Sequence, residues 1–148
     1  AEGSLKRVVD VPGHMVYHEP DAHVYVADTG NGRIVKLDTT FGSMTGPLSP
    51  VYEPLALSGT FGNTSVTGVV APGTLQAPSG LAVHEDVIYV SDHDTSEIHA
   101  FDMQGNLLRS LDTGLPMKSV AGIEVGPDGE HLWFVDMNRG SVYRIDPM

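Results

Sequence analysis

The sequence carries the pattern Tyr25-Val26-Ala27-Asp28-Thr29-Gly30-Asn31-Gly32-Arg33-Ile34, in which an apolar strand ends in Asp, a polar turn follows and a second strand begins. That second strand ends in another Asp, ten residues after the first. The same spacing occurs three times along the chain, between Asp28 and Asp38, Asp92 and Asp102, and Asp136 and Asp146. An internal repeat of this kind indicates a fold assembled from similar strand units.

A short segment with alternating apolar residues precedes each unit, as in Gly80-Leu81-Ala82-Val83-His84. A period of two, many β-branched residues and flanking Gly and Pro are typical of β-strands. We therefore predict strands at 13–18, 23–28 and 33–38, at 80–84, 87–91 and 97–102, and at 121–126, 131–136 and 141–145. Fourth strands are predicted at 65–70 and 107–112. The expected fold class is all-β.

Units of this size match the roughly 40–45 residues of a four-stranded propeller blade. The chain is therefore interpreted as a single half-propeller over 1–148, with three blades at 13–70, 79–112 and 120–146. The first blade carries an insertion at 41–64, for which a disordered or surface excursion and a lid or interface arm are alternatives. The third blade lacks its outer strand, whereas 5–10 is a spare strand that belongs to no blade of this chain.

Three blades form an open arc, because propellers close with four to eight blades. Two identical chains joined head-to-tail would give six blades. The strand at 5–10 of each chain would then complete the third blade of the other, covering an edge that is otherwise unpaired. We therefore expect a homodimer of half-propellers with strand exchange. A longer parent chain is the alternative.

The formal net charge is −11, from 19 acidic and 8 basic residues. Nucleic-acid binding is not expected, because phosphate contacts need clustered Lys and Arg. No apolar run reaches the roughly 18 residues that span a bilayer, so no membrane anchor is expected. The chain has no Cys and opens at Ala1 without Met. We expect a soluble protein of unknown compartment, periplasmic or secreted if an upstream signal was removed.

The stretch 25–34 and the segment Pro78-Ser79-Gly80-Leu81-Ala82-Val83 resemble the NHL repeat, in which a Pro-x-Gly strand leads into a strand pair of the form YVADTGN-x-RI. The resemblance covers most of the chain and is strongest in the first blade. It implies a six-bladed β-propeller of NHL type. It implies no single activity, because the fold hosts scaffolds, binding modules and enzymes alike.

In a propeller, the loops that lead into the first strand and those between the second and third strands open on one face around the axis. We expect the ligand-binding residues on this loop face: His14, Asp28, Asp92, His93, Asp94, Asp136 and Asn138. Imidazoles and carboxylates are ligands for Zn²⁺, and carboxylates for Ca²⁺. The repeated aspartates have an alternative role, since Asp at a strand end accepts backbone N–H bonds from the following turn. His18 and His84 should lie at the opposite end, as surface residues.

Two functions follow from these residues. The first is a non-catalytic module that binds a protein or small molecule through the loop face. The second is a metal-dependent lyase or hydrolase with an axial site around His14, similar in outline to peptidyl-α-hydroxyglycine α-amidating lyases, which hold zinc with three histidines in Pro-His pairs. Here Pro12-Gly13-His14 comes close to that pattern, but the other two positions read Pro78-Ser79 and Val120-Ala121. Two of the three ligands are absent, so the binding module is favoured.

Overall fold

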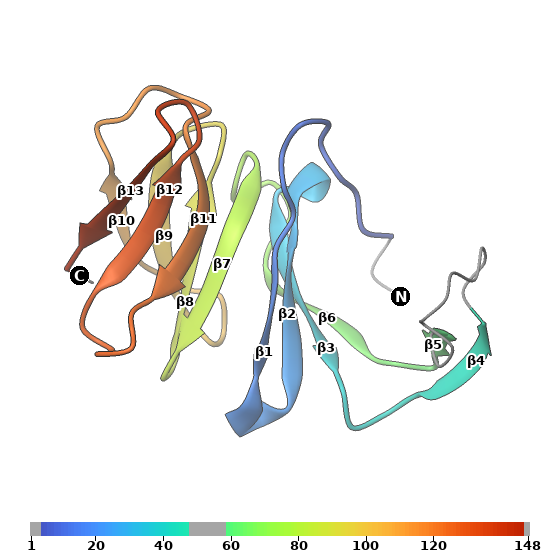
Figure 1. Ribbon diagram of the computed structural model, residues 1–148. Coiled ribbons are helices and arrows are strands. Elements are labelled where there is room, and N and C mark those ends of the chain that lie inside the picture. The colour runs from blue at the N-terminus through green and yellow to red at the C-terminus, as the bar shows by residue number, and fades with distance from the viewer. Residues whose placement is uncertain (1–3, 48–58, 147–148) are drawn as a thin grey trace.

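A computed structural model describes residues 4–47 and 59–146, in which thirteen strands form (Figure 1). The first sheet contains β1 (Met15–His18), β2 (His23–Asp28), β3 (Arg33–Asp38) and β6 (Val66–Val70). The second contains β7 (Pro78–His84), β8 (Val87–Asp92), β9 (Glu97–Asp102) and β10 (Leu107–Asp112). The third contains, within the described residues, β11 (Val120–Val125), β12 (Leu132–Asp136) and β13 (Ser141–Ile145). The described residues also form two 3₁₀ turns, η1 (Glu19–Asp21) and η2 (Thr29–Asn31).

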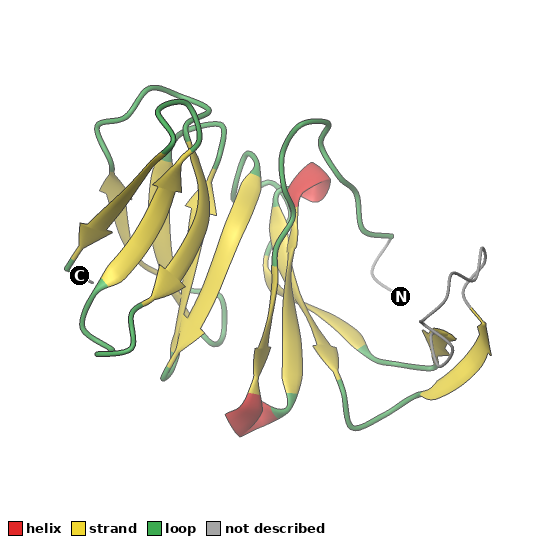
Figure 2. Cartoon of the chain, viewed as in Figure 1, coloured by secondary structure: helices red, strands yellow, loops and turns green. Residues whose placement is uncertain are grey.

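The all-β prediction is confirmed, as Figure 2 shows. Strands in the three main sheets pair antiparallel, and their bounds lie within two residues of the predicted ones. The repeat is visible in the register, because the Asp that ends each second strand lies opposite the first residue of the third strand. In the described part of the chain, no helix is long and apolar enough to cross a membrane.

The segment 5–10, predicted as a strand that completes a blade of another chain, forms no strand within the single chain, and its pairing with a second copy stays a prediction. Residues 4–8 have no regular structure and lie against the turn that follows β2. The Lys6 N–H donates to Asp28 Oδ1 at 2.7 Å, and the Gly30 N–H donates to the Lys6 carbonyl at 2.8 Å. Asp10 has a φ of 63°, which ends any extended run. Both backbone groups of Lys6 therefore find their partners at the turn after β2 of the same chain.

The insertion predicted at 41–64 contains a hairpin of β4 (Ser43–Pro47) and β5 (Gly59–Gly62), which pair antiparallel. Figure 1 shows this hairpin set apart from the first sheet, joined by loops to β3 and β6. Residues 48–58 lie outside the described part of the chain. The insertion therefore includes regular structure at its base.

Two apolar cores separate the three sheets. The core between the first and second sheets includes Tyr25, Ile34, Leu81, Val90 and Phe101. The core between the second and third sheets includes Ile98, Val120, Ile123, Leu132 and Phe134. The innermost strands β1, β7 and β11 lie side by side, with β7 in contact with both others (Figure 1). The second sheet is therefore packed on both faces.

The second and third sheets approach each other closely at Gly80. A Cβ at this position would lie 2.7 Å from Ser91 Oγ and 2.8 Å from Ile123 Cγ2, and would overlap the carbonyl oxygen of Ala121. The Gly80 N–H donates to Ser91 Oγ at 2.8 Å, and that hydroxyl donates to the Ala121 carbonyl. Glycine is required here because the neighbouring backbone occupies the space of a side chain.

Candidate functional site

The repeated aspartates Asp28, Asp92 and Asp136 are buried at the ends of β2, β8 and β12. In Asp92, Oδ2 accepts the Gln76 N–H at 2.6 Å and Oδ1 accepts the Ala77 N–H at 3.0 Å. Both donors belong to the chain that leads into β7. The carboxylate therefore ties the incoming chain to the second sheet, and its oxygens are occupied by backbone donors.

The carboxylate oxygens of Asp28 likewise accept hydrogen bonds, and Asp28 also forms a buried ion pair with Arg33. Its Oδ2 accepts bonds from Arg33 Nε at 2.6 Å and from Asn31 Nδ2 at 2.7 Å. Burial alone would raise the pKa of Asp28, but the Lys6 N–H, Asn31 and Arg33 outweigh it and lower the pKa overall. Asp28 thus stays ionised and serves the fold.

Asp136 differs from the other two. Its Oδ1 accepts the N–H groups of Asn138 at 3.0 Å and Arg139 at 3.2 Å. Its Oδ2 is buried and has no hydrogen-bond partner in the described residues, with Arg139 Nε 3.9 Å away. The Lys118 and Ser119 N–H groups, which correspond to those that bind Asp92, donate elsewhere, to the His93 carbonyl and to Ser96 Oγ.

His14 is held by the second sheet. Its Nδ1 accepts the Leu81 N–H at 3.1 Å, so the neutral ring carries its proton on Nε2. An imidazole in this state donates a hydrogen bond and has no free lone pair for a metal. His14 lines a cavity of about 160 Å³ together with Pro12, Gly13, Ser79, Gly80 and Gly122. This geometry gives no support to a metal-dependent lyase or hydrolase at His14.

The other candidate residues also serve local structure. His93 Nδ1 lies 3.0 Å from the Val120 carbonyl, Asp94 N–H donates to Asp92 at 3.2 Å, and Asn138 Nδ2 donates to Ser119 Oγ at 2.8 Å. Within the described residues, no group of three or more His, Asp or Glu side chains is placed to hold a metal ion. The seven candidates lie at the same end of the sheets, but they do not converge on a Zn²⁺ or Ca²⁺ position.

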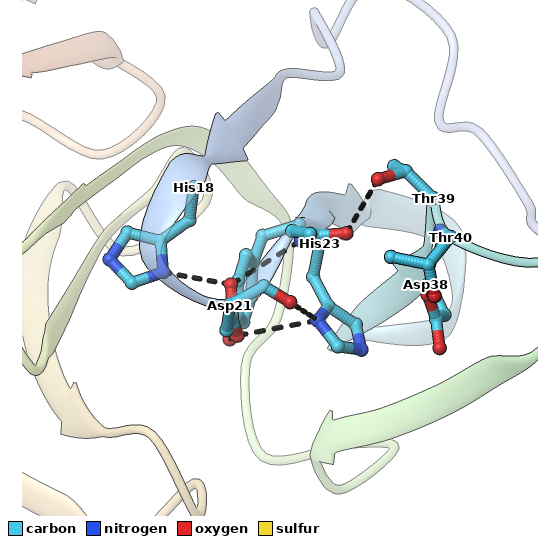
Figure 3. Close-up of polar contacts among 8 residues, drawn as sticks. His18, Asp21, His23, Asp38, Thr39 and Thr40 are labelled. Atoms are coloured by element: carbon cyan, nitrogen blue, oxygen red, sulfur yellow. Dashed lines mark hydrogen bonds and ion pairs between the residues drawn. The ribbon is translucent and has the colours of Figure 1, made fainter.

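Sequence reasoning missed a polar cluster at the opposite end of the first sheet, drawn in Figure 3. His18 Nδ1 lies 2.8 Å from Asp21 Oδ1, and His23 Nδ1 lies 2.6 Å from the Asp21 carbonyl. Tyr25 OH donates to Asp21 Oδ2 at 2.6 Å. The two rings lie on opposite sides of Asp21, so they do not share a metal position. The pairing of β1 with β2 places His18 opposite His23. The predicted strand bounds imply the same pairing, and this was the signal from which the cluster could have been found.

This cluster makes the free energy of unfolding depend on pH. Burial would raise the pKa of Asp21, but the hydrogen bonds from Tyr25 and His18, with the charge of His23, hold it below its ordinary value of 3.8. Burial and the bond to Asp21 raise the pKa of Tyr25. The folded state therefore favours the Asp21 carboxylate, whose contribution is present above the ordinary pKa and is lost as pH falls through the folded pKa.

Asp21→Asn should remove this contribution. The difference in unfolding free energy between wild type and variant is expected to be largest above about pH 5 and to shrink toward about pH 2. Urea unfolding at a series of pH values measures it. A difference that stays constant over this range would contradict the assignment.

Several exposed apolar side chains lie in the loops at one end of the sheets. Val8 and Val9 precede β1, Met117 precedes β11, and Met137 lies in the turn after β12. Val8, Val9 and Met137 line one cavity of about 440 Å³, together with Arg7, Asp10, Val11 and Pro12. We call Val8, Val9 and Met137, which line this cavity together, the loop-face patch. These residues lie outside the repeat pattern, so the pattern did not indicate them.

No protein-family model matches this chain, and no curated protein matches it. Solved structures match this chain. A chain in the crystal structure of a nidogen/laminin complex is 20% identical, with a TM-score of 0.59 over 88% of this chain and 41% of that chain. Hydrazine synthase of Kuenenia stuttgartiensis is 16% identical, with a TM-score of 0.50 over 99% of this chain and 39% of that chain. The chain thus spans about two fifths of these structures, and the likeness shows a β-propeller-type fold.

Proposed function

We propose that this chain is an NHL-type propeller scaffold, assembled as a homodimer, that binds a protein partner through its loop face. The loop-face patch carries the proposal. Contiguous exposed apolar side chains on a folded protein are typical of interaction sites, and Met side chains adapt to a partner's shape. A fold likeness that includes a chain from a protein–protein complex is compatible with this role.

In this proposal the repeated aspartates of the loop face support the patch and do not bind the partner themselves. Asp28, Asp92 and Asp136 hold the turns and the incoming chain segments that present the patch. A partner would contact Val9 and Met137, because they project from two separate loops beside one cavity. Scaffolds commonly bind in this way, through loops that a rigid sheet positions.

Met137→Asp should weaken this binding. The probe is a set of peptides selected from a random library against the immobilised wild-type chain. Their Kd values are expected to rise about tenfold or more, because losing one apolar anchor costs on the order of 1.4 kcal/mol. Leu108→Asp is the matched control, since Leu108 is also an exposed apolar residue but lies on β10. Peptides that bind Met137→Asp as tightly as wild type would contradict the proposal.

A further inference from the structure

The third sheet exposes the face that is buried in the other two. Trp133 stands at the repeat position of Tyr25, three residues before the strand-end Asp, and Val142 stands at the position of Ile34 and Ile98. Tyr25 and Ile34 are 0% exposed and Ile98 is 2% exposed, because each packs against the next sheet. Trp133 is 41% exposed and Val142 is 63% exposed. The third sheet therefore carries a face built to contact a following sheet.

The first sheet exposes the complementary face. Met15, Leu81 and Ile123 occupy the same register position in the three innermost strands. Leu81 is 0% and Ile123 is 3% exposed, because each packs against the preceding sheet, whereas Met15 is 66% exposed. Tyr17, two residues further along β1, is also exposed. The first sheet thus carries a face built to contact a preceding sheet.

We propose that these two faces contact each other between two copies of this chain: the third sheet of one copy packs on the first sheet of the other, in both directions. The occupant is a second copy because one chain carries both halves of the same repeated contact. Such a head-to-tail contact closes under a twofold axis, and two copies of three sheets give six, within the range of closed propellers. The inference rests on the propeller scaffold proposed above.

Space for this contact exists at Gly122. Gly122 is the repeat equivalent of Gly80, whose Cβ position is filled by the third sheet. At Gly122 the nearest atom to a Cβ would be Val135 Cγ2 at 3.9 Å, so the corresponding space is open. A cavity of about 260 Å³ lies there, lined by His14, Gly122, Trp133, Val135 and Val142 among others.

The equivalent positions of the repeat also predict which residue fills this space. Ile123 fills the space beside Gly80, and Met15 is its equivalent in the first sheet. Met15 of the second copy should therefore lie beside Gly122. The contact uses existing sheet faces and leaves Lys6 bonded to Asp28 and Gly30 in its own chain. Strand exchange is consequently not part of this proposal.

The solution mass of the wild-type chain, measured by light scattering after size exclusion without any ligand, tests the contact. A mass of twice 15.8 kDa is expected. Val142→Arg and Met15→Arg should each give 15.8 kDa, whereas Leu108→Arg, which changes an exposed residue outside both faces, should remain a dimer. Circular dichroism checks that each variant is folded. A wild-type monomer would overturn the proposal.

Mixing the two monomeric variants tests the direction of the contact. The third sheet of Met15→Arg and the first sheet of Val142→Arg are both unchanged, so the mixture keeps one of the two contacts and carries both arginines in the other. It should therefore regain a species of twice the chain mass, at a higher protein concentration than wild type needs. In a dimer that used the same sheet face of both copies, only one of the two variants would be monomeric, and mixing would not restore the dimer. That result would overturn the proposal. The mass is independent of the loop-face patch, so peptide binding that survives in monomeric Val142→Arg would leave the binding proposal standing.

Discussion

Asp92→Asn should lower the free energy of unfolding by about 3 kcal/mol. In the wild type each carboxylate oxygen accepts a buried backbone N–H, and in the variant the side-chain NH₂ group, itself a donor, would replace one of these oxygens. Both oxygens of Asp92 are occupied, one by Gln76 N–H and the other by Ala77 N–H. The asparagine oxygen can replace only one of them. The remaining N–H is left unpaired, and the chain leading into β7 loses an anchor. Denaturant unfolding followed by the fluorescence of the single Trp measures the change.

Asp136→Asn is the matched control. In the described part of the chain, Oδ1 is the one oxygen of the Asp136 side chain that accepts hydrogen bonds, and the asparagine oxygen can keep them. The amide nitrogen takes the place of Oδ2, which has no hydrogen-bond partner within the described residues, and the change removes a buried charge together with its long ion pair to the exposed Arg139 at 3.9 Å. The expected change is below about 1 kcal/mol in either direction. Equal losses in the two variants, compared at one protein concentration, would contradict the different roles assigned to the two aspartates.

Gly80→Ala should be at least as damaging, with a loss of about 3 kcal/mol or more, because the added methyl group forces two packed sheets apart. The neighbouring atoms are the Ala121 backbone and the Ser91 hydroxyl that is bonded to it. Neither can move aside without breaking the contact between the second and third sheets. The expected result is a lower midpoint of denaturant unfolding.

Gly122→Ala tests the same position in the third sheet, where the space is open in the single chain. Measured in the Val142→Arg background, so that assembly does not contribute, it should leave stability within about 0.5 kcal/mol of its parent. In the wild-type background the same change should weaken the dimer. A large loss of stability in the monomeric background would contradict the assignment of open space beside Gly122.

The strands were predictable because the repeat makes local pattern and tertiary packing agree. The spacing from Asp28 to Asp38 and its two copies gave strand bounds within two residues. The segment at 5–10 was not predictable from its composition. Its apolar residues suit a strand, but the hydrogen bonds that Lys6 donates to Asp28 and accepts from Gly30, both distant in sequence, decide its path. Such tertiary contacts override local preference.

The candidate site was less predictable, because it depends on which atoms face which donors. The sequence marks Asp28, Asp92 and Asp136 as equivalent. Only the structure shows that Lys118, with a φ of 64°, precedes a segment whose N–H groups point away from Asp136. The protonated nitrogen of His14 likewise depends on the Leu81 N–H, which lies on another sheet. Sequence spacing carries no information on either point.

The most direct test of the account is a cross-link between the first sheet of one copy and the third sheet of another. The chain has no Cys, so Met15→Cys and Val142→Cys each introduce a single reactive thiol at an exposed position. A short bismaleimide should join the two variants into a covalent dimer when they are mixed, and should leave each variant alone largely as monomer on a denaturing gel. No covalent dimer in the mixture, or equal cross-linking of either variant with itself, would contradict the head-to-tail contact between sheets.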